Sequence, residues 1–254
     1  MTPKYVCITG ASSGIGRSTA IAFARLGSNL IIGARRTERL QTLQEELLSA
    51  GSPSVKSDVL DVTHQKSIEK FAETTLNFCE DKLDVLVNNA GKALGIGQVK
   101  DANLDDWQEM LDTNLMGLAR VTQQFLPSMI ENKQGHIILI GSIAGHQAYS
   151  GGSMYCASKF GVKAIAKSLK LELCGTNIRV SSIDPGMVNT EFSLVRLGDQ
   201  EKAEEVYKGM KPLSPEDIAE CIIFATTRPA HVNIDEIIVM PTAQAAVGIT
   251  HREE

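Results

Sequence analysis

The sequence predicts a single α/β domain over residues 1–254, built on a doubly wound, seven-stranded and mostly parallel sheet with helices on both faces. Short apolar runs rich in β-forming residues alternate with longer helical patterns along the chain. Such alternation is typical of parallel strands joined by right-handed crossovers. Several strand-like runs are almost wholly apolar, as expected for strands covered on both faces. No repeat, low-complexity tract or Pro/Gly/Ser-rich linker divides the sequence.

The expected elements follow from these patterns in chain order. Strands are predicted at residues 5–9, 29–33, 54–56, 84–87, 136–141, 179–183 and 236–240. Helices are predicted at residues 14–27, 36–50, 64–79, 104–131, 153–175 and 215–227. The last helix has a clear start signal, because Ser214 can cap it, Pro215 suits its first position and Glu216 places an acid in its first turn.

Residues 187–213 interrupt this alternation. They follow the carboxyl end of a predicted strand, which is where ligands bind in open α/β sheets. We interpret them as a mobile substrate loop with a short helix; the alternative is an ordinary surface excursion.

Composition and charge exclude several classes of protein. A hydrophobic content of 43% supports a large core, and a net charge of −5 disfavours nucleic acid or an anionic membrane as a partner. The sequence shows neither a signal segment nor a run long enough to span a bilayer, so we expect a cytoplasmic protein. The five cysteines are scattered without a CxxC pair and the histidines lack metal-ligand spacing, which predicts reduced thiols and no metal site.

A glycine-rich turn joins the first predicted strand to the first helix. It reads Thr9-Gly10-Ala11-Ser12-Ser13-Gly14-Ile15-Gly16, a GxxxGxG spacing. Glycines there permit a tight turn and a close approach of a ligand phosphate to free N–H groups at a helix N-terminus. The turn lacks the GK[ST] of a nucleotide-triphosphate loop. It therefore predicts binding of a dinucleotide pyrophosphate.

The end of the second strand predicts which dinucleotide binds. An NAD site usually carries an acid here for the ribose hydroxyls, but the sequence has Ala34 followed by Arg35 and Arg36. Guanidinium groups suit a 2′-phosphate through charge-assisted hydrogen bonds. We therefore expect NADP(H); two solvated arginines at a helix start are the alternative.

Further motifs resemble the short-chain dehydrogenase/reductase family over essentially the whole chain. They are TGxxxGIG at residues 9–16, Asn88-Asn89-Ala90-Gly91 after the fourth strand, YxxxK from Tyr155 to Lys159, and Asp184-Pro185-Gly186 after the sixth strand. The resemblance implies a Rossmann fold, a nicotinamide cofactor, a tyrosine-based mechanism and a homotetramer.

A narrower likeness lies in residues 141–145 (GSIAG), 191–196 (EFSLVR) and 231–234 (HVNI). These segments resemble the branch of NADP-dependent 3-hydroxy acid dehydrogenases, which includes serine and allo-threonine dehydrogenases. The resemblance implies oxidation of short β-hydroxy acids, including those of the 3-hydroxypropionate type, and reduction of the matching semialdehydes or keto acids.

The residues themselves are suited to this chemistry. Lys159 follows Tyr155 by four positions on a predicted helix, so the two side chains lie on one face about 5–6 Å apart. An ammonium and a positive nicotinamide ring would favour the phenolate and lower the tyrosine pKa, which is ordinarily near 10. Ser142, at the end of the fifth strand, can hold the substrate oxygen beside the phenol.

Other roles are implied by the resemblance alone. Asn114 would bend its long helix and hold a water that links Lys159 to solvent, and Lys159 would also bind the nicotinamide ribose. Asp61 and Val62 would flank the adenine, although Asp61 could also cap a helix. The ribose side would be lined by Asn88, Ala90 and Gly91, and the nicotinamide covered by Pro185, Gly186, Val188 and Thr190.

Arg196 is the candidate for binding a substrate carboxylate, because a guanidinium gives bidentate recognition and residue 196 lies in the predicted substrate loop. A plain surface arginine is the alternative. Gln147, close after Ser142, is a candidate for shaping the substrate pocket.

The favoured function is that of an NADP-dependent dehydrogenase of short 3-hydroxy acids. One alternative is a carbonyl or β-ketoacyl reductase of bulkier ketones. Another is a non-catalytic NADP(H)-sensing protein, which the presence of Ser142, Tyr155 and Lys159 together disfavours.

Overall fold

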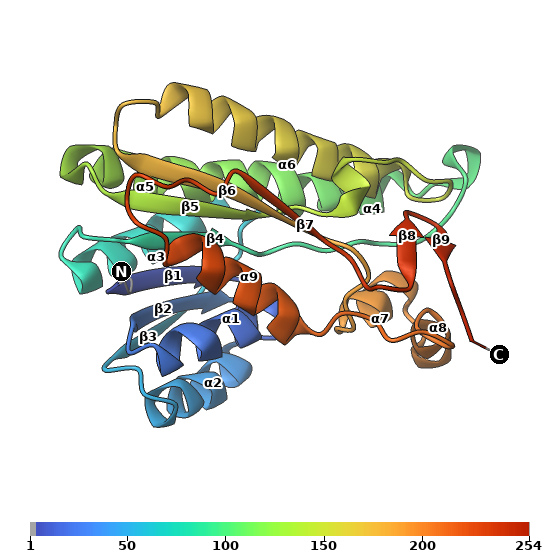
Figure 1. The fold of residues 1–254 in the computed structure, drawn as a ribbon, viewed down its shortest axis with the longest axis horizontal. Helices are drawn as coiled ribbons and strands as arrows, with labels where there is room; N and C mark the ends of the chain where they lie inside the picture. The colour runs from blue at the N-terminus through green and yellow to red at the C-terminus, as the bar shows by residue number, and fades with distance from the viewer. Residues whose placement is uncertain (1–3, 254) are drawn as a thin grey trace.

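The sheet of the computed structural model has seven strands in the order β3-β2-β1-β4-β5-β6-β7 (Figure 1). The structure describes residues 4–253. The strands are β1 Tyr5–Thr9, β2 Asn29–Ala34, β3 Val55–Val59, β4 Val85–Asn88, β5 Gly135–Ile140, β6 Ile178–Pro185 and β7 Glu236–Val239. All of their pairings are parallel. The doubly wound α/β fold expected from the sequence is confirmed.

Helices cover both faces of this sheet (Figure 1). One face carries α1 Gly14–Arg25, α2 Thr37–Ser49 and α9 Pro215–Thr226. The other carries α3 Gln65–Cys79, α4 Leu104–Leu111, α5 Leu118–Asn132 and α6 Ser153–Glu172. Within residues 4–253, no helix combines the length and apolar character needed to cross a bilayer.

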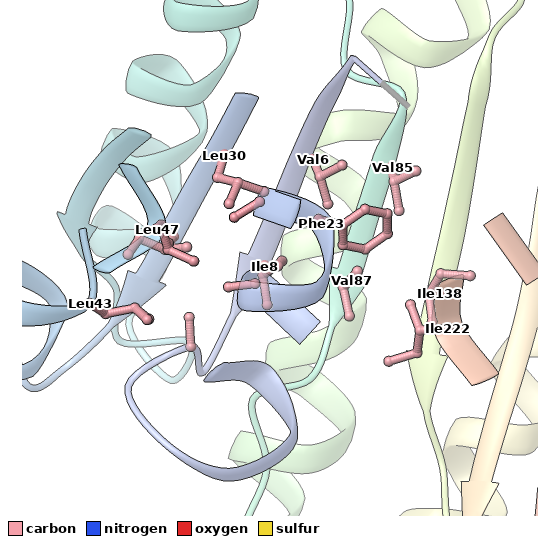
Figure 2. Packing of buried hydrophobic residues seen from close by; sticks show 14 of the residues in the cluster. Val6, Ile8, Phe23, Leu30, Leu43, Leu47, Val85, Val87, Ile138 and Ile222 are labelled. Carbon is pink, nitrogen blue, oxygen red and sulfur yellow. The ribbon is translucent and has the colours of Figure 1, made fainter. Parts of the chain in front are cut away.

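The two hydrophobic clusters explain why the strand sequences are apolar throughout. Along β5, Ile138 and Ile140 belong to the cluster under α1 and α9, whereas Ile137 and Leu139 belong to the cluster under α3, α5 and α6. Successive side chains of a strand point to opposite faces, so covering both faces requires apolar residues at consecutive positions. Figure 2 shows part of the first cluster, in which Phe23 of α1 faces β4 and Ile222 of α9 lies beside Ile138.

The helix predicted over residues 104–131 is interrupted in the structure, at Asn114, where the family resemblance implied a bend. A π-helical turn at Asp112–Gly117 separates α4 from α5. The side chain of Asn114 binds outside its own helix, to the backbone of Lys92 and the hydroxyl of Ser158. Gly117 packs so closely on Val62 that a Cβ would come within 2.8 Å of it. These contacts hold the chain in the wider turn.

The segment 187–213 differs from the sequence-based expectation, since it holds two short helices rather than one. They are α7 Phe192–Leu197 and α8 Gln200–Glu205. An isolated bridge between Val188 and Leu213 joins the two ends of the segment. A hairpin of β8 Gln244–Ala246 and β9 Ile249–Thr250 lies near it, beyond the carboxyl end of β6 (Figure 1).

Two neighbouring leucines of α2 test the packing of the first cluster. Leu47 is fully buried, whereas Leu48 is 45% exposed. We expect Leu47→Ala to lower the free energy of unfolding by about 2–5 kcal/mol, because it leaves a cavity in the core. Leu48→Ala, the matched control, should change it by no more than about 0.5 kcal/mol. Urea denaturation measures both, and equal effects would contradict the assigned packing.

Candidate active site

A cavity of about 360 Å³ opens at the carboxyl ends of the strands, where the strand order reverses between β1 and β4. This is the place where open α/β sheets bind ligands. The predicted site residues that line it are Gly10, Ser12, Ser13, Gly14, Ile15, Arg35, Arg36, Asp61, Val62, Ala90, Gly91, Ser142, Tyr155, Lys159, Pro185, Gly186, Val188 and Thr190. The fold thus brings together most of the positions that the sequence indicated.

The glycine-rich turn fits a phosphate group. Gly10 and Gly14 have φ values of +66° and +54°, and a Cβ on Gly10 would come within 2.9 Å of Ala90. Ser13, the N-cap residue of α1, makes no side-chain capping bond, so N–H groups at the start of this helix remain for an anion. Ala11 and Gly16 are buried beneath the turn and do not line the cavity.

The two predicted arginines lie at the mouth of this turn. Arg36 donates hydrogen bonds to the hydroxyls of Ser12 (2.9 Å) and Ser13 (2.7 Å), and Arg35 lines the cavity beside it. Arg36 also pairs with Glu191, which bridges at 2.6 Å to Arg39. The hydrogen bond from Arg36 is the largest of the interactions that lower the pKa of Glu191. The arginine side chains at the end of β2 could therefore hold an anionic group.

Asp61 is not a cap of α3, whose N-cap residue is His64. Its carboxylate accepts hydrogen bonds from the N–H and hydroxyl of Thr63. Burial alone would raise the pKa of Asp61, but these hydrogen bonds bring it below its usual value.

Asn88 does not line the cavity, contrary to its expected ribose contact. Its side chain is buried and donates to the Thr122 hydroxyl at 2.9 Å. Asn89 lines the cavity instead and donates to the carbonyls of Thr9 and Gly10. Since β4 ends at residue 88, the next residue is the one that reaches the strand tip.

Ser142, Tyr155 and Lys159 come together on one wall of the cavity. Ser142 follows β5, while Tyr155 and Lys159 lie one turn apart on α6. The Lys159 ammonium lies 5.9 Å from the centre of the Tyr155 ring and donates to the carbonyl of Ile140 at 2.8 Å. A phenol, an ammonium and a hydroxyl therefore meet beside the cleft, an arrangement able to transfer a proton to or from a substrate oxygen.

Burial dominates the titration of these groups. It raises the pKa of Tyr155 to about 12, although a hydrogen bond with Ser142 opposes the rise. It lowers the pKa of Lys159 to about 8, and the charge of Asp184 opposes that fall. The lowering of the tyrosine pKa is expected for a site that also holds an oxidised nicotinamide, and it stays a prediction. Without ligands, loss of hydration outweighs the influences that favour the phenolate, which include the charge of Arg196.

Asn114 lies in the π-helical turn behind Lys159. A Cβ on Gly91 would come within 3.3 Å of the Asn114 Oδ1 and 3.8 Å of the Lys159 Nζ, so both side chains converge on the same glycine. Asn114 is 1% exposed, and its amide joins the Lys92 backbone to Ser158.

Arg196 lines a second cavity of about 180 Å³ and does not line the first. Tyr155 lines both. The guanidinium carbon of Arg196 lies 5.5 Å and 5.7 Å from the ring centres of Tyr149 and Tyr155, and its Nε donates to the Gly95 carbonyl. Its Nη2 is buried without a hydrogen-bond partner among the described residues. A buried donor without a partner is costly, and an anionic ligand would satisfy it.

Gln147 lines neither cavity. It is exposed, and its side-chain oxygen accepts a hydrogen bond from the Val247 N–H.

Sequence reasoning missed three residues of the segment 187–213 that line the first cavity, namely Glu191, Phe192 and Val195. Phe192 packs its ring 5.5 Å from that of Tyr155, and Glu191 binds Arg36 and Arg39 as described. The only signal for Glu191 was an acid in a loop opposite a cluster of arginines. Contacts of this kind depend on how the loop folds back over the sheet.

Comparison with known proteins places this geometry in context. Residues 4–200 match the family model of the short chain dehydrogenases. An NADP-dependent 3-hydroxy acid dehydrogenase of Schizosaccharomyces pombe is 43% identical over 253 residues, which cover 99% of this chain and 97% of the relative. Sulfoacetaldehyde reductase 2 of Chromohalobacter salexigens is 44% identical over 242 residues, covering 94% and 95%. The closed form of a serine dehydrogenase complexed with NADP⁺ superposes with a TM-score of 0.91 at 40% identity, covering 98% of this chain and 100% of that one.

Proposed function

The chain belongs to the short chain dehydrogenase family, and on this premise we propose that it interconverts short 3-hydroxy acids with the corresponding semialdehydes or keto acids. It is an NADP-dependent oxidoreductase, as the sequence predicted. The identity of the acid, the roles of the individual residues and the tyrosine mechanism are the proposed part.

The observation that carries the proposal is the position of Arg196 beside Tyr155. Both line the second cavity, and the unpartnered Nη2 of Arg196 is buried there. A substrate that occupies this cavity can place an anionic group on the guanidinium and its reacting oxygen on the phenol. Because the guanidinium carbon is only 5.7 Å from the Tyr155 ring centre, the two substrate groups must be close together, as they are in a 3-hydroxy acid.

The names of the relatives agree with this requirement. In a 3-hydroxy acid, one carbon separates the carboxylate from the carbon that carries the hydroxyl. In sulfoacetaldehyde, the substrate named for one relative, one carbon likewise separates the sulfonate from the carbonyl. Serine, named for a structural neighbour, is itself a 3-hydroxy acid. Arg196 would recognise the anion in each of them.

The cofactor-binding residues follow from the first cavity. The turn 10–16 and the start of α1 would hold the pyrophosphate, and Arg35 and Arg36 the 2′-phosphate. When bound, NADP(H) would supply or accept the hydride at its nicotinamide ring, and Pro185, at the end of β6, and Thr190, in the segment after it, would hold that ring.

The proton is handled by this chain's own side chains. Ser142 would orient the substrate oxygen, and Tyr155, protonated because of its raised pKa, would donate a proton to a carbonyl undergoing reduction. In the reverse direction Tyr155 would take the hydroxyl proton, and the Lys159 ammonium would favour the resulting phenolate. Asn114, joined to the backbone beside Gly91, would hold the water that connects Lys159 to solvent.

Residues 187–213 would form the substrate loop. Glu191 attaches this segment to Arg36 and Arg39, and Arg196 attaches it to Gly95. The segment thus spans the cleft from the adenosine end to the catalytic end. A homotetramer remains a prediction of the family resemblance, and a cytoplasmic location remains a prediction of the sequence pattern.

Tyr155→Phe tests the proton transfer. We expect turnover of serine and 3-hydroxypropionate with NADP⁺ to fall at least about 100-fold, because the acid–base group is lost, while NADPH still binds by fluorescence titration. Tyr5→Phe is the control and should keep full activity, because Tyr5 lies at the amino end of β1, away from the cavity at the carboxyl ends of the strands. A Tyr155→Phe enzyme that retains turnover would refute the assignment.

Arg36→Ala and Arg35→Ala test the 2′-phosphate pocket. Each should raise the dissociation constant of NADPH about tenfold or more, since charge-assisted hydrogen bonds are worth about 1.5–3 kcal/mol. The dissociation constant of NADH should hardly change. Arg25→Ala, an exposed arginine at the end of α1, serves as control. An equal effect on both cofactors would argue against a phosphate contact.

Arg196→Ala tests the substrate class. It should lower kcat/KM for 3-hydroxy acids and sulfoacetaldehyde about tenfold or more, and leave kcat/KM for neutral ketones of similar size unchanged. Arg196→Lys should restore part of the activity with acids. If acids and neutral ketones lose activity equally, the arginine supports the loop rather than the substrate, and a ketone reductase becomes the better description.

A further inference from the structure

Three polar side chains form a line directly behind the wall that carries Ser142 and Lys159. The Lys163 ammonium lies 2.6 Å from the Nδ1 of His146, and the Nε2 of His146 lies 2.6 Å from the Oδ2 of Asp184. Asp184 is 2% exposed, and the side chains of His146 and Lys163 are 18% and 22% exposed. None of the three lines the first or the second cavity.

The chemistry of the partners fixes the direction of these hydrogen bonds. An ammonium only donates, so the Nδ1 of His146 accepts from Lys163. A carboxylate only accepts, so the Nε2 carries the proton and donates to Asp184. The histidine is thereby held as one neutral tautomer, with both of its ring nitrogens engaged.

The line joins the segments that present the catalytic residues. Lys163 lies one turn after Lys159 on α6, His146 follows the short helix Ile143–Gly145 that begins after Ser142, and Asp184 lies next to Pro185 on β6. The Asp184 carboxylate covers Gly141 so closely that a Cβ there would overlap it. The oxygen that lies against Gly141, Oδ1, also accepts from the Ser182 hydroxyl at 2.5 Å.

Asp184 and Lys159 lie against the same stretch of backbone, since Lys159 donates to the carbonyl of Ile140 and Asp184 covers the next residue, Gly141. The charge of Asp184 therefore acts on Lys159. Burial lowers the pKa of Lys159 to about 8, and the largest opposing influence is Asp184. Burial raises the pKa of Asp184, and hydrogen bonds from Ser182 and His146 oppose this rise. The titratable groups around the pair are Tyr155 and Lys163 from α6, His146, and Glu236 from β7, whose carboxylate lies 3.2 Å from Lys163 and 3.7 Å from His146.

We propose that Lys163, His146 and Asp184 act as a positioning unit, in which the first two keep Asp184 an ionised carboxylate behind Gly141, and Asp184 in turn keeps Lys159 in its ammonium form. The unit acts through Lys159 and touches no substrate. The consequence for catalysis rests on the role proposed above for Lys159; the effect on the charge of Lys159 does not.

A metal site is the rival interpretation of the same residues. His146, Asp184 and Glu236 present ligand atoms within 4.8 Å of one another. However, the Lys163 ammonium already contacts the other nitrogen of His146 and the Glu236 carboxylate. An ammonium of this chain therefore already pairs with two of these three residues, which favours the positioning unit.

Competitive acetylation tests the proposal without cofactor or substrate. Acetic anhydride labels the neutral amine, and mass spectrometry of the peptide containing residue 159 gives the pH midpoint of its reaction. We expect Asp184→Asn to lower this midpoint by about one pH unit, the lower end of the effect of one close charge. His146→Leu should shift it in the same direction, because Asp184 then loses a donor and is protonated more easily.

Two further variants separate the proposed role from a structural one. His146→Gln offers an amide N–H in place of the Nε2–H, so its midpoint should stay close to the wild-type value. His231→Leu, the same change at an exposed histidine, should leave it at the wild-type value. His146→Ala replaces His146→Leu if the leucine variant does not fold, as judged by its melting temperature.

The outcomes are distinct. The proposal would be overturned by an unchanged midpoint in Asp184→Asn or in His146→Leu. It would also be overturned if the midpoint of His146→Gln shifted as far as that of His146→Leu. Failure of the wild-type enzyme to turn over 3-hydroxy acids would refute the proposed function but leave the acetylation result intact. If both proposals hold, the alkaline limb of the kcat profile shifts to lower pH in the same variants, with little change in KM.

Discussion

Burial of the parallel sheet on both faces is the constraint on which the rest of the structure depends. Since helices cover both faces, every connection must leave at a strand tip, and the carboxyl tips of β1, β4, β5 and β6 share one edge. The order reverses between β1 and β4, so the loops there diverge and leave a cavity. Residues far apart in sequence, such as Gly10, Ser142 and Pro185, meet at this cavity only because the strands are in parallel register.

The same burial sets the electrostatics of the site. Removal from water favours the neutral phenol and the neutral amine, so burial raises the pKa of Tyr155 and lowers the pKa of Lys159. Function in both reaction directions then requires nearby charges to offset the loss of hydration. Asp184 supplies one such charge within the protein, and the bound cofactor supplies another in its oxidised form. The charge balance of the site is therefore completed only when the cofactor binds.

Ion pairs connect the two ends of the cleft through one segment. Glu191 binds Arg36 and Arg39 at the adenosine end, and five residues later Arg196 lies over Tyr155 at the catalytic end. A short helix, α7, lies between these two contacts. One segment of the chain therefore contacts both the arginines proposed to bind the 2′-phosphate and the tyrosine proposed to transfer the proton.

The sequence by itself determined the features that depend on local periodicity: the seven strands, the phosphate turn, and the Tyr155–Lys159 pair on one helical face. It did not determine the π-helical turn around Asn114, the choice of Asn89 over Asn88 at the tip of β4, or the bridge from Glu191 to Arg36. Each of these depends on side chains brought together from distant segments. The hydrophobic periodicity of an element indicates which of its faces is buried. Which side chains contact each other across the cleft depends instead on how the elements pack in the tertiary structure.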